Sequence, residues 1–411
     1  MSAGRHVVVG GGLAAAKAVE TLRDEGYDGG LTVVAREPHR PYERPPLSKD
    51  YLRGEAERES VFPLSADWYA EHDVELLTAT EATAVDLAGR SVSLADGRNL
   101  PYEKLLLATG SDPRRIPLPG LDLDGVHELR TLDDSDALAA ALRAAHDGGA
   151  GRRLAIVGDG WIGLEVAASA RSLGLDVTVI GLGTHPLERV LGPEMGELYG
   201  QVHTDHGVHL HRRAQVTGIS GSGGRATGVD IADGTHVDAD LVLVAVGAVP
   251  NVTLARDAGL ALDSATGGVV ASATLQTTDP DVFVAGDIAS VPTARYGRSV
   301  RVEHWATALN QGPHAARAML GATAPYPELP YFFSDQYDVG MEYLGFVAGP
   351  DAYDEVVVSG SLPDRELVAF WVKDGRVEAG MAVNVWDRME DVKALIHRDA
   401  VDRAELESFV G

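Results

Sequence analysis

The sequence predicts an α/β fold with two Rossmann-like dinucleotide-binding domains and a small α+β C-terminal interface domain. Two observations carry this prediction. A short β-branched run, a glycine turn and a helical stretch open the chain at His6, and the same pattern returns at Leu154. After residue 322, runs of alternating hydrophobicity separated by turn residues are typical of a small sheet.

Each copy of the repeated pattern reads as strand, helix, strand, which is the βαβ unit of a parallel sheet. In the first copy we expect a strand at 7–9, a helix at 15–26 and a strand at 31–35. In the second copy we expect a strand from residue 154, a helix at 163–174 and a strand at 177–180.

The remaining segments fill in around these units. Between the copies we expect a proline-rich loop at 38–48, a helix at 64–72 and strands at 74–77, 91–94 and 104–108. After the second copy we expect an antiparallel stretch at 216–246, a strand and turn at 282–287 and a helix at 306–320. The C-terminal part should hold strands at 355–359, 367–372 and 377–383, and a helix at 387–397.

The composition limits the classes of function. A formal net charge of −26 argues against a nucleic-acid partner, because phosphate recognition needs a basic surface. No apolar run approaches the ~20 residues of a membrane span, and the N-terminus lacks the layout of a signal peptide, so we expect a cytoplasmic protein without membrane binding. The 411 residues contain no cysteine, which excludes thiolate and disulfide chemistry; no metal site is expected.

Two glycine turns provide the strongest functional signal. A Gly-x-Gly turn between strand and helix lets backbone N–H groups approach a pyrophosphate at the positive helix end. Gly10, Gly12 and Ala15 hold the three small positions in the first turn, and Gly158, Gly160 and Gly163 hold them in the second. One such motif is weak evidence, but two copies in matching βαβ contexts predict two bound dinucleotides.

An acidic residue that binds the ribose is expected after the second strand of each copy, roughly 20 residues past the turn. Glu37 holds that place in the first copy. In the second copy the place is Gly181, with no acid, which weakens selectivity for NADH over NADPH. No arginine pair for a 2′-phosphate replaces the acid, although Arg189 could reach. We expect a modest preference for NADH, with NADP(H) as the alternative.

Six motifs occur in an order that resembles a known family. They are Pro-Tyr-Glu-Arg-Pro-Pro-Leu-Ser-Lys at 41–49, Leu-Ala-Thr-Gly-Ser at 107–111, the second glycine turn at 158–165, Val-Ala-Gly-Asp at 284–287, Arg-Val-Glu-His-Trp at 301–305 and Phe-Ser-Asp-Gln-Tyr at 333–337. Together they resemble the FAD-dependent ferredoxin and rubredoxin reductases of the putidaredoxin reductase type. The resemblance implies a glutathione reductase-like fold: an FAD-binding domain at 1–115 and 245–321, an NAD(P)-binding domain at 116–244 and a C-terminal interface domain at 322–411.

The resemblance also implies roles for particular residues. Lys49 would lie near the isoalloxazine, Asp287 would bind the ribityl chain, and the Trp305 backbone would meet the pyrimidine edge of the flavin. The full set of expected cofactor-binding residues is Gly10, Gly12, Leu13, Ala14, Ala15, Glu37, Arg44, Lys49, Ala82, Ala108, Thr109, Gly110, Arg130, Gly158, Gly160, Ile162, Gly163, Glu165, Gly247, Gly286, Asp287, Glu303, His304 and Trp305.

Three residues are candidates for the reaction itself. Glu165 would lie beside Lys49 at the flavin as a buried ion pair kept for function, where the alternative is a solvated carboxylate on a helix. Trp161, at the helix start, would cover or flank the nicotinamide pocket, where the alternative is an ordinary core aromatic.

The expected reaction is hydride transfer from NAD(P)H to FAD, followed by single-electron transfer to a 2Fe–2S ferredoxin that serves an oxygenase. Without cysteine the flavin is the only redox centre. Direct reduction of a small acceptor such as a quinone or oxygen is one alternative, and a non-enzymatic NAD-binding flavoprotein like the apoptosis-inducing-factor relatives is another. The oligomeric state stays open between monomer and dimer.

A ferredoxin partner of an acidic protein needs a local positive patch, since ferredoxins of oxygenase systems are usually acidic. Arg295, Arg298 and Arg301 form the densest arginine cluster without intervening acids, and Arg317 extends it on the next helix. We expect the ferredoxin to dock there, where the C-terminal domain meets the flavin edge. The alternative is that these arginines pair with the protein's own carboxylates.

Overall fold

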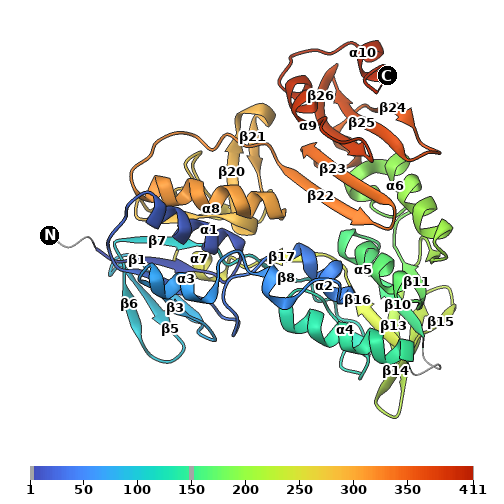
Figure 1. Cartoon of the computed structure of the whole chain (residues 1–411), viewed down its shortest axis with the longest axis horizontal. Coiled ribbons are helices and arrows are strands. Elements are labelled where there is room, and N and C mark those ends of the chain that lie inside the picture. Colours follow the sequence, from blue (N-terminus) through green and yellow to red (C-terminus); the bar gives the residue numbers. More distant parts are fainter. Residues whose placement is uncertain (1–3, 148–151, 411) are drawn as a thin grey trace. The chain divides into compact units, whose positions relative to one another are not determined.

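The computed structural model describes residues 4–147 and 152–410 (Figure 1). Its contacts divide the chain into two compact units. The first unit comprises Met1–Glu43, Arg58–Asp112 and Val249–Pro330. The second comprises Arg44–Glu57, Pro113–Ala248 and Tyr331–Gly411. Two of the five passages of the chain between the units fall within the short strands β8 (Ser111–Pro113) and β17 (Ala248–Pro250).

The first unit is built on a five-stranded parallel sheet with the order β19-β7-β1-β2-β3. Its strands are β19 (Val282–Val284), β7 (Lys104–Leu107), β1 (His6–Val9), β2 (Leu31–Val34) and β3 (Val74–Leu77). The helices are α1 (Leu13–Asp24), α3 (Ala66–Glu71), α7 (Thr253–Asp257) and α8 (Trp305–Met319). Two three-stranded sheets complete the unit: β4 (Ala82–Asp86), β5 (Ser91–Leu94) and β6 (Asn99–Pro101), and β18 (Val269–Val270), β20 (Ala289–Thr293) and β21 (Arg298–Val300).

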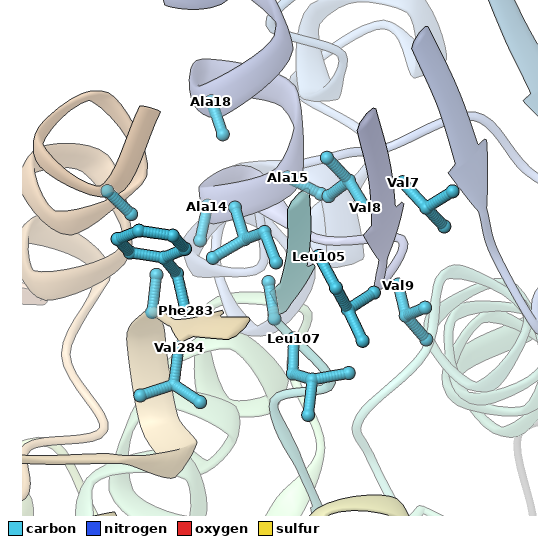
Figure 2. Packing of buried hydrophobic residues seen from close by; sticks show 14 of the residues in the cluster. Val7, Val8, Val9, Ala14, Ala15, Ala18, Leu105, Leu107, Phe283 and Val284 are labelled. Atoms are coloured by element: carbon cyan, nitrogen blue, oxygen red, sulfur yellow. The ribbon is translucent and has the colours of Figure 1, made fainter. Parts of the chain in front are cut away.

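The core of the first unit lies where α1 packs on the middle of this sheet (Figure 2). All four residues of β1 are buried, because it is the central strand of a parallel sheet that is covered on both faces. Ala14, Ala15 and Ala18 of α1 are buried, and their small side chains let the helix lie close to its neighbours. At Gly312 of α8, a Cβ would overlap the backbone oxygen of Ala14, so α1 and α8 pack in backbone contact.

The second unit repeats the architecture with a five-stranded parallel sheet in the order β12-β11-β10-β16-β9. Its strands are β12 (His209–His211), β11 (Asp176–Ile180), β10 (Arg153–Val157), β16 (Leu241–Val244) and β9 (Val126–His127). The helices are α2 (Asp50–Arg53), α4 (Leu132–Asp147), α5 (Trp161–Ser172) and α6 (Glu188–Asp205). The predicted pair of parallel Rossmann-like sheets is thereby confirmed.

The prediction of one antiparallel stretch at 216–246 is wrong at its end. Strands β13 (Val216–Ser222), β14 (Arg225–Ile231) and β15 (His236–Asp238) do form an antiparallel sheet. Strand β16 instead pairs in parallel with β10, with Leu241 opposite Leu154. Four consecutive buried apolar residues fit either kind of pairing, so the sequence pattern does not reveal this crossover.

The C-terminal part of the second unit contains a five-stranded antiparallel sheet in the order β22-β23-β26-β25-β24. Its strands are β22 (Tyr331–Gln336), β23 (Val339–Gly345), β26 (Arg376–Val383), β25 (Glu366–Lys373) and β24 (Glu355–Ser361). The helices α9 (Met389–Ile396) and α10 (Arg403–Glu407) follow. The three expected strands and the helix are confirmed, and β22 and β23 are additions that the sequence reading missed.

The segment Arg44–Glu57 belongs by its contacts to the second unit, although the predicted FAD-binding domain runs continuously through residue 115. Within that unit, Ser135 Oγ donates to the backbone oxygen of Leu47 at 2.8 Å, and Ser169 Oγ donates to that of Ser48 at 2.7 Å. The division into three domains by cofactor stays a prediction.

Candidate functional site

The first glycine turn joins β1 to α1. Gly10 has a φ of +149°, and a Cβ there would overlap the backbone oxygen of Ala108, so only glycine fits. At Gly12, which precedes α1, a Cβ would meet no atom within 4 Å, and no side chain caps the helix. The space beside Gly12, at the positive end of a helix without a side-chain cap, fits a pyrophosphate.

Two residues outside the expected cofactor-binding set hold the Glu37 carboxylate and the Thr109-Gly110 backbone near this turn. Tyr42 Oη donates a hydrogen bond to the Glu37 carboxylate. Asn251 binds the end of the expected Thr109-Gly110 motif: its Nδ2 donates to Thr109 O at 3.1 Å, its N–H donates to Gly110 O at 2.8 Å, and Thr109 Oγ1 donates to Asn251 O at 2.6 Å. The predicted cofactor residues here are thus fixed before any ligand binds.

The Gly286-Asp287 turn is fixed from two sides. Gly286 N donates to Oε1 of the buried Gln311 at 2.8 Å. Arg301 donates to the backbone oxygen of Asp287 at 3.0 Å and forms an ion pair with Glu303. The Arg301 side chain is only 17% exposed, so the expectation that it belongs to an exposed docking patch is wrong. Its charge holds the turn instead.

The next residues lead into α8, which begins at Trp305. Burial lowers the pKa of His304 to about 4, so this imidazole is neutral at physiological pH. On the same helix Arg317 pairs with Glu25 at 2.8 Å and is therefore also engaged within the protein. Two members of the expected arginine cluster thus have partners in their own unit.

The second glycine turn, between β10 and α5, repeats the first. Gly158 has a φ of +115°, and a Cβ there would overlap the backbone oxygen of Ala245. A Cβ at Gly160 would meet nothing within 4 Å, and α5 also lacks a side-chain cap. At Gly163 a Cβ would overlap the oxygen of Gly158, which explains the third small residue by close packing of helix on turn. This turn also fits a pyrophosphate.

A buried polar cluster lies at the first turns of α5. Lys49 Nζ lies 2.7 Å from Glu165 Oε1. Ser334 Oγ donates to the same oxygen at 2.7 Å, and Ser48 Oγ donates to Oε2 at 2.5 Å. All four residues are buried. The structure brings Lys49 and Glu165 together within the second unit, and their catalytic role stays a prediction.

The hydrogen bonds continue from this cluster into the C-terminal sheet. Gln336 Nε2 donates to Ser334 Oγ at 3.0 Å, and His203 Nε2 lies 2.8 Å from Gln336 Oε1. Burial lowers the pKa of His203 to about 4, so the ring is neutral. Because an amide oxygen only accepts, Nε2 must carry the proton. Every donor in this series of hydrogen bonds therefore points toward the Glu165 carboxylate.

The structure gives the positions of the other expected residues but does not test whether they bind a cofactor. The Arg44 guanidinium donates to the backbone oxygen of Arg130, so these two distant motif residues do meet. Gly247 O accepts from Arg114 N at 2.8 Å. Leu13 and Ala108 are buried, Ala82 is half-buried and Ile162 is 38% exposed. Their contacts with a cofactor stay predictions.

Trp161 lies in an aromatic group with two neighbours in the second unit. Its ring makes edge contacts with Tyr199 and Phe332, at centroid distances of 5.5 and 4.9 Å. In the described part of the chain, Trp161 Nε1 and Tyr199 Oη are buried without a hydrogen-bond partner. Two unsatisfied polar atoms in one aromatic group are unusual and indicate a place where a ligand could supply partners.

We expect Trp161→Ala to raise the KM for the nicotinamide dinucleotide about two- to tenfold, the range for loss of one aromatic contact. Steady-state kinetics with ferricyanide as acceptor measures this. Phe332→Ala, which removes a ring packed on Trp161, is the matched control and should change KM less. A lower unfolding temperature with unchanged KM would show that Trp161 is an ordinary core aromatic.

Across 4–147 and 152–410, no helix is long and apolar enough to cross a lipid bilayer. In the same ranges no group of three or more histidine, cysteine, aspartate or glutamate side chains is arranged to hold a metal ion.

Comparison with known proteins gives consistent matches over almost the whole chain. The pyridine nucleotide-disulphide oxidoreductase family model matches residues 4–312, and the reductase C-terminal model matches 331–407. Rhodocoxin reductase of Rhodococcus erythropolis is 36% identical over 92% of this chain and 86% of its own length. The ferredoxin–NAD(+) reductase component of the anthranilate 1,2-dioxygenase system of Burkholderia cepacia is 38% identical over 98% of this chain and 96% of its own length. The crystal structure of the covalent putidaredoxin reductase–putidaredoxin complex matches with a TM-score of 0.88 and 34% identity, covering 99% of this chain and 98% of the other.

Proposed function

The chain belongs to the pyridine nucleotide-disulphide oxidoreductase family, in the group of the putidaredoxin and rhodocoxin reductases, and from this membership we propose that it transfers electrons from NADH through FAD to a 2Fe–2S ferredoxin. Bound FAD supplies the chemistry, because it accepts a hydride and releases electrons singly. The name of the Burkholderia cepacia relative, a ferredoxin–NAD(+) reductase component of a dioxygenase system, supports this class of partner. The expected cytoplasmic location stays a prediction.

The observation that carries the proposal is the duplicated glycine turn. Gly12 and Gly160 each precede an uncapped helix and face open space, so each turn fits one pyrophosphate. Hydride transfer from one dinucleotide to another requires both to be bound at the same time, and two such turns can hold both. The 411 residues contain no cysteine, so no thiol in this chain can take up the electrons. The acceptor of the flavin's electrons is then a separate molecule.

In this proposal the first turn holds FAD and the second holds NADH. Lys49 would lie beside the bound flavin ring, where an ammonium group would favour negative charge on the ring. Glu165 is a positioning residue: its carboxylate holds the Lys49 ammonium at 2.7 Å and is itself held by two serine hydroxyls. The ordered donors around Glu165 keep this arrangement ready before the substrate arrives.

The proposal is tested on the purified protein. It should be yellow, with one FAD per chain that acid precipitation releases, and anaerobic NADH should bleach the flavin absorbance. With a 2Fe–2S ferredoxin present, NADH should reduce the carrier at a rate far above that with a quinone or oxygen. Rapid turnover of a quinone without any carrier would favour a small-acceptor reductase, and a very slow bleaching step would favour a non-enzymatic flavoprotein.

The docking prediction is tested at two of the four arginines, because Arg298 is exposed and Arg295 is partly exposed at the surface. Replacing Arg295 and Arg298 with glutamate should raise the KM for ferredoxin about tenfold at low ionic strength and flatten its dependence on salt. Ferricyanide reduction should not change, since it needs no protein docking.

The matched control for this prediction is Arg225→Glu with Arg256→Glu, two exposed arginines elsewhere whose reversal changes the net charge equally. That control should leave the KM for ferredoxin near the wild-type value. Ferredoxin turnover and salt dependence that survive the reversal of Arg295 and Arg298 would place the docking site elsewhere.

A further inference from the structure

The second glycine turn carries an acid in its middle, at Asp159, and the strand that follows ends in Gly181 where an acid is expected. We propose that Asp159 takes over the task of the missing acid: its carboxylate accepts the 2′-hydroxyl of the adenosine ribose and repels a 2′-phosphate, which makes the protein select NADH over NADPH. This inference rests on the proposed function only in that the second turn binds a nicotinamide dinucleotide.

The contact between the two positions carries the inference. Strands β10 and β11 pair in parallel with Val157 opposite Ile180, and Gly158 N donates to Ile180 O at 2.9 Å. The residues just past the two strand ends are therefore neighbours. A Cβ built on Gly181 would overlap Oδ2 of Asp159. The Asp159 carboxylate thus occupies the volume where a side chain of residue 181 would begin, and glycine at 181 leaves room for it.

In the first copy of the βαβ unit, a glycine lies in the middle of the turn and the acid follows the second strand. The middle of its turn is Gly11, and its acid, Glu37, follows the second strand. A Cβ on Gly11 would lie 3.0 Å from the Cβ of Ala35, the first residue after β2. The middle of the turn and the first position after the second strand are thus close in both copies. In the first copy the acid Glu37 lies two residues beyond Ala35, whereas in the second copy the Asp159 carboxylate lies directly against Gly181, the first residue after the strand.

The Asp159 carboxylate is also available for a ligand. It is half-buried, and among the described residues it forms no ion pair with another side chain. Burial raises its pKa above the ordinary value, with a further contribution from Glu188, although a hydrogen bond from its own backbone N–H acts in the opposite direction. A ribose hydroxyl would give this carboxylate a second donor.

The other charged groups around the loop after β11 do not offer the same function. Glu188 Oε2 already accepts from the backbone N–H groups of Thr184 and His185, at 2.8 and 3.0 Å. Arg213 is one candidate for binding a 2′-phosphate: its backbone N–H donates to Gly183 O at 2.9 Å, and its Nε donates to Thr184 Oγ1 at 3.3 Å. Asp159 therefore favours a ligand with a free 2′-hydroxyl, whereas Arg213 would favour a ligand with a 2′-phosphate.

The experiment measures binding of two probes that lack nicotinamide, ADP-ribose and its 2′-phosphorylated form, to the FAD-loaded protein by isothermal titration calorimetry. The wild type should bind ADP-ribose at least about a hundredfold more tightly. Asp159→Asn keeps the shape and removes the charge, so the ratio of the two dissociation constants should fall at least tenfold. Asp176→Asn, at the exposed start of β11, removes the same charge at the far end of the strand and should leave the ratio unchanged.

A transfer variant tests the geometry. Asp159→Gly combined with Gly181→Glu moves the acid to the strand side and should restore selectivity for ADP-ribose, while its unfolding temperature reports whether the fold tolerates the change. A ratio that Asp159→Asn leaves unchanged, or a wild type that prefers the phosphorylated probe, would overturn the proposal. Because neither probe reacts, both outcomes are independent of ferredoxin turnover, whose failure would count against the proposed function alone.

Discussion

Replacing Glu165 with alanine should lower the free energy of unfolding by about 3–5 kcal/mol, the cost of leaving a buried charge without its partner. The Lys49 and Glu165 side chains are only 11% and 8% exposed, so water cannot compensate the ammonium once the carboxylate is gone. The same substitution leaves the Ser48 and Ser334 hydroxyls without their acceptor. Hydride transfer from NADH to the flavin should slow as well, because Lys49 loses the group that positions it.

Denaturant unfolding at saturating FAD measures this, since cofactor binding would otherwise shift the transition. Replacing both partners, Lys49→Met with Glu165→Leu, should restore most of the stability but not the rate of flavin reduction, because no charge is then left unpaired. Asp391→Asn, which breaks an exposed pair with Arg388, should cost less than about 1 kcal/mol. If Glu165→Ala cost no more than Asp391→Asn, the pair would be a solvated surface bridge in solution.

Substitutions in the two glycine turns should separate the two dinucleotides. Gly10→Ala should yield colourless protein, with FAD affinity lowered at least about a hundredfold, because the methyl group is strained at φ +149° and overlaps the Ala108 oxygen. Gly158→Ala should keep FAD and its spectrum while weakening NADH binding to a similar degree, since its Cβ would overlap the Ala245 oxygen. Flavin absorbance and calorimetric titration with NAD+ measure the two effects.

Gly97→Ala and Gly234→Ala are the matched controls, because both glycines have positive φ, at +88° and +92°, but a Cβ on either meets nothing within 4 Å. In these two variants the alanine has an unfavourable positive φ but its Cβ overlaps no other atom, and both positions lie outside the two glycine turns. Both should keep FAD and NAD+ affinity near wild type. If Gly158→Ala lost FAD while Gly10→Ala stayed yellow, the assignment would be reversed: the second turn would bind FAD and the first would bind NADH.

The parts of the fold that could be predicted are those encoded by local periodicity. Both βαβ units, the third strand and turn at Val282–Val284 and three strands of the C-terminal sheet follow from runs of apolar residues bounded by glycine and proline. For strand β16 the predicted antiparallel pairing is wrong. Its partner β10 is far away in the sequence, and a run of four apolar residues does not indicate whether a strand pairs in parallel or antiparallel.

The site was predictable where glycine spacing or a family motif marks it. The chain from Glu165 through Ser334 and Gln336 to His203 could not be predicted, because it joins α5, β22 and α6 across long sequence distances. Asp159 and Gly181 each departed visibly from the expected pattern. Only their contact in space shows that the two departures compensate each other.

The most direct test of the central claim is an anaerobic titration of a 2Fe–2S ferredoxin with NADH in the presence of catalytic amounts of this protein. The expected result is two molecules of ferredoxin reduced per NADH consumed, because one hydride carries two electrons and the carrier takes one at a time. Bleaching of the flavin by NADH without reduction of any 2Fe–2S ferredoxin would contradict the account.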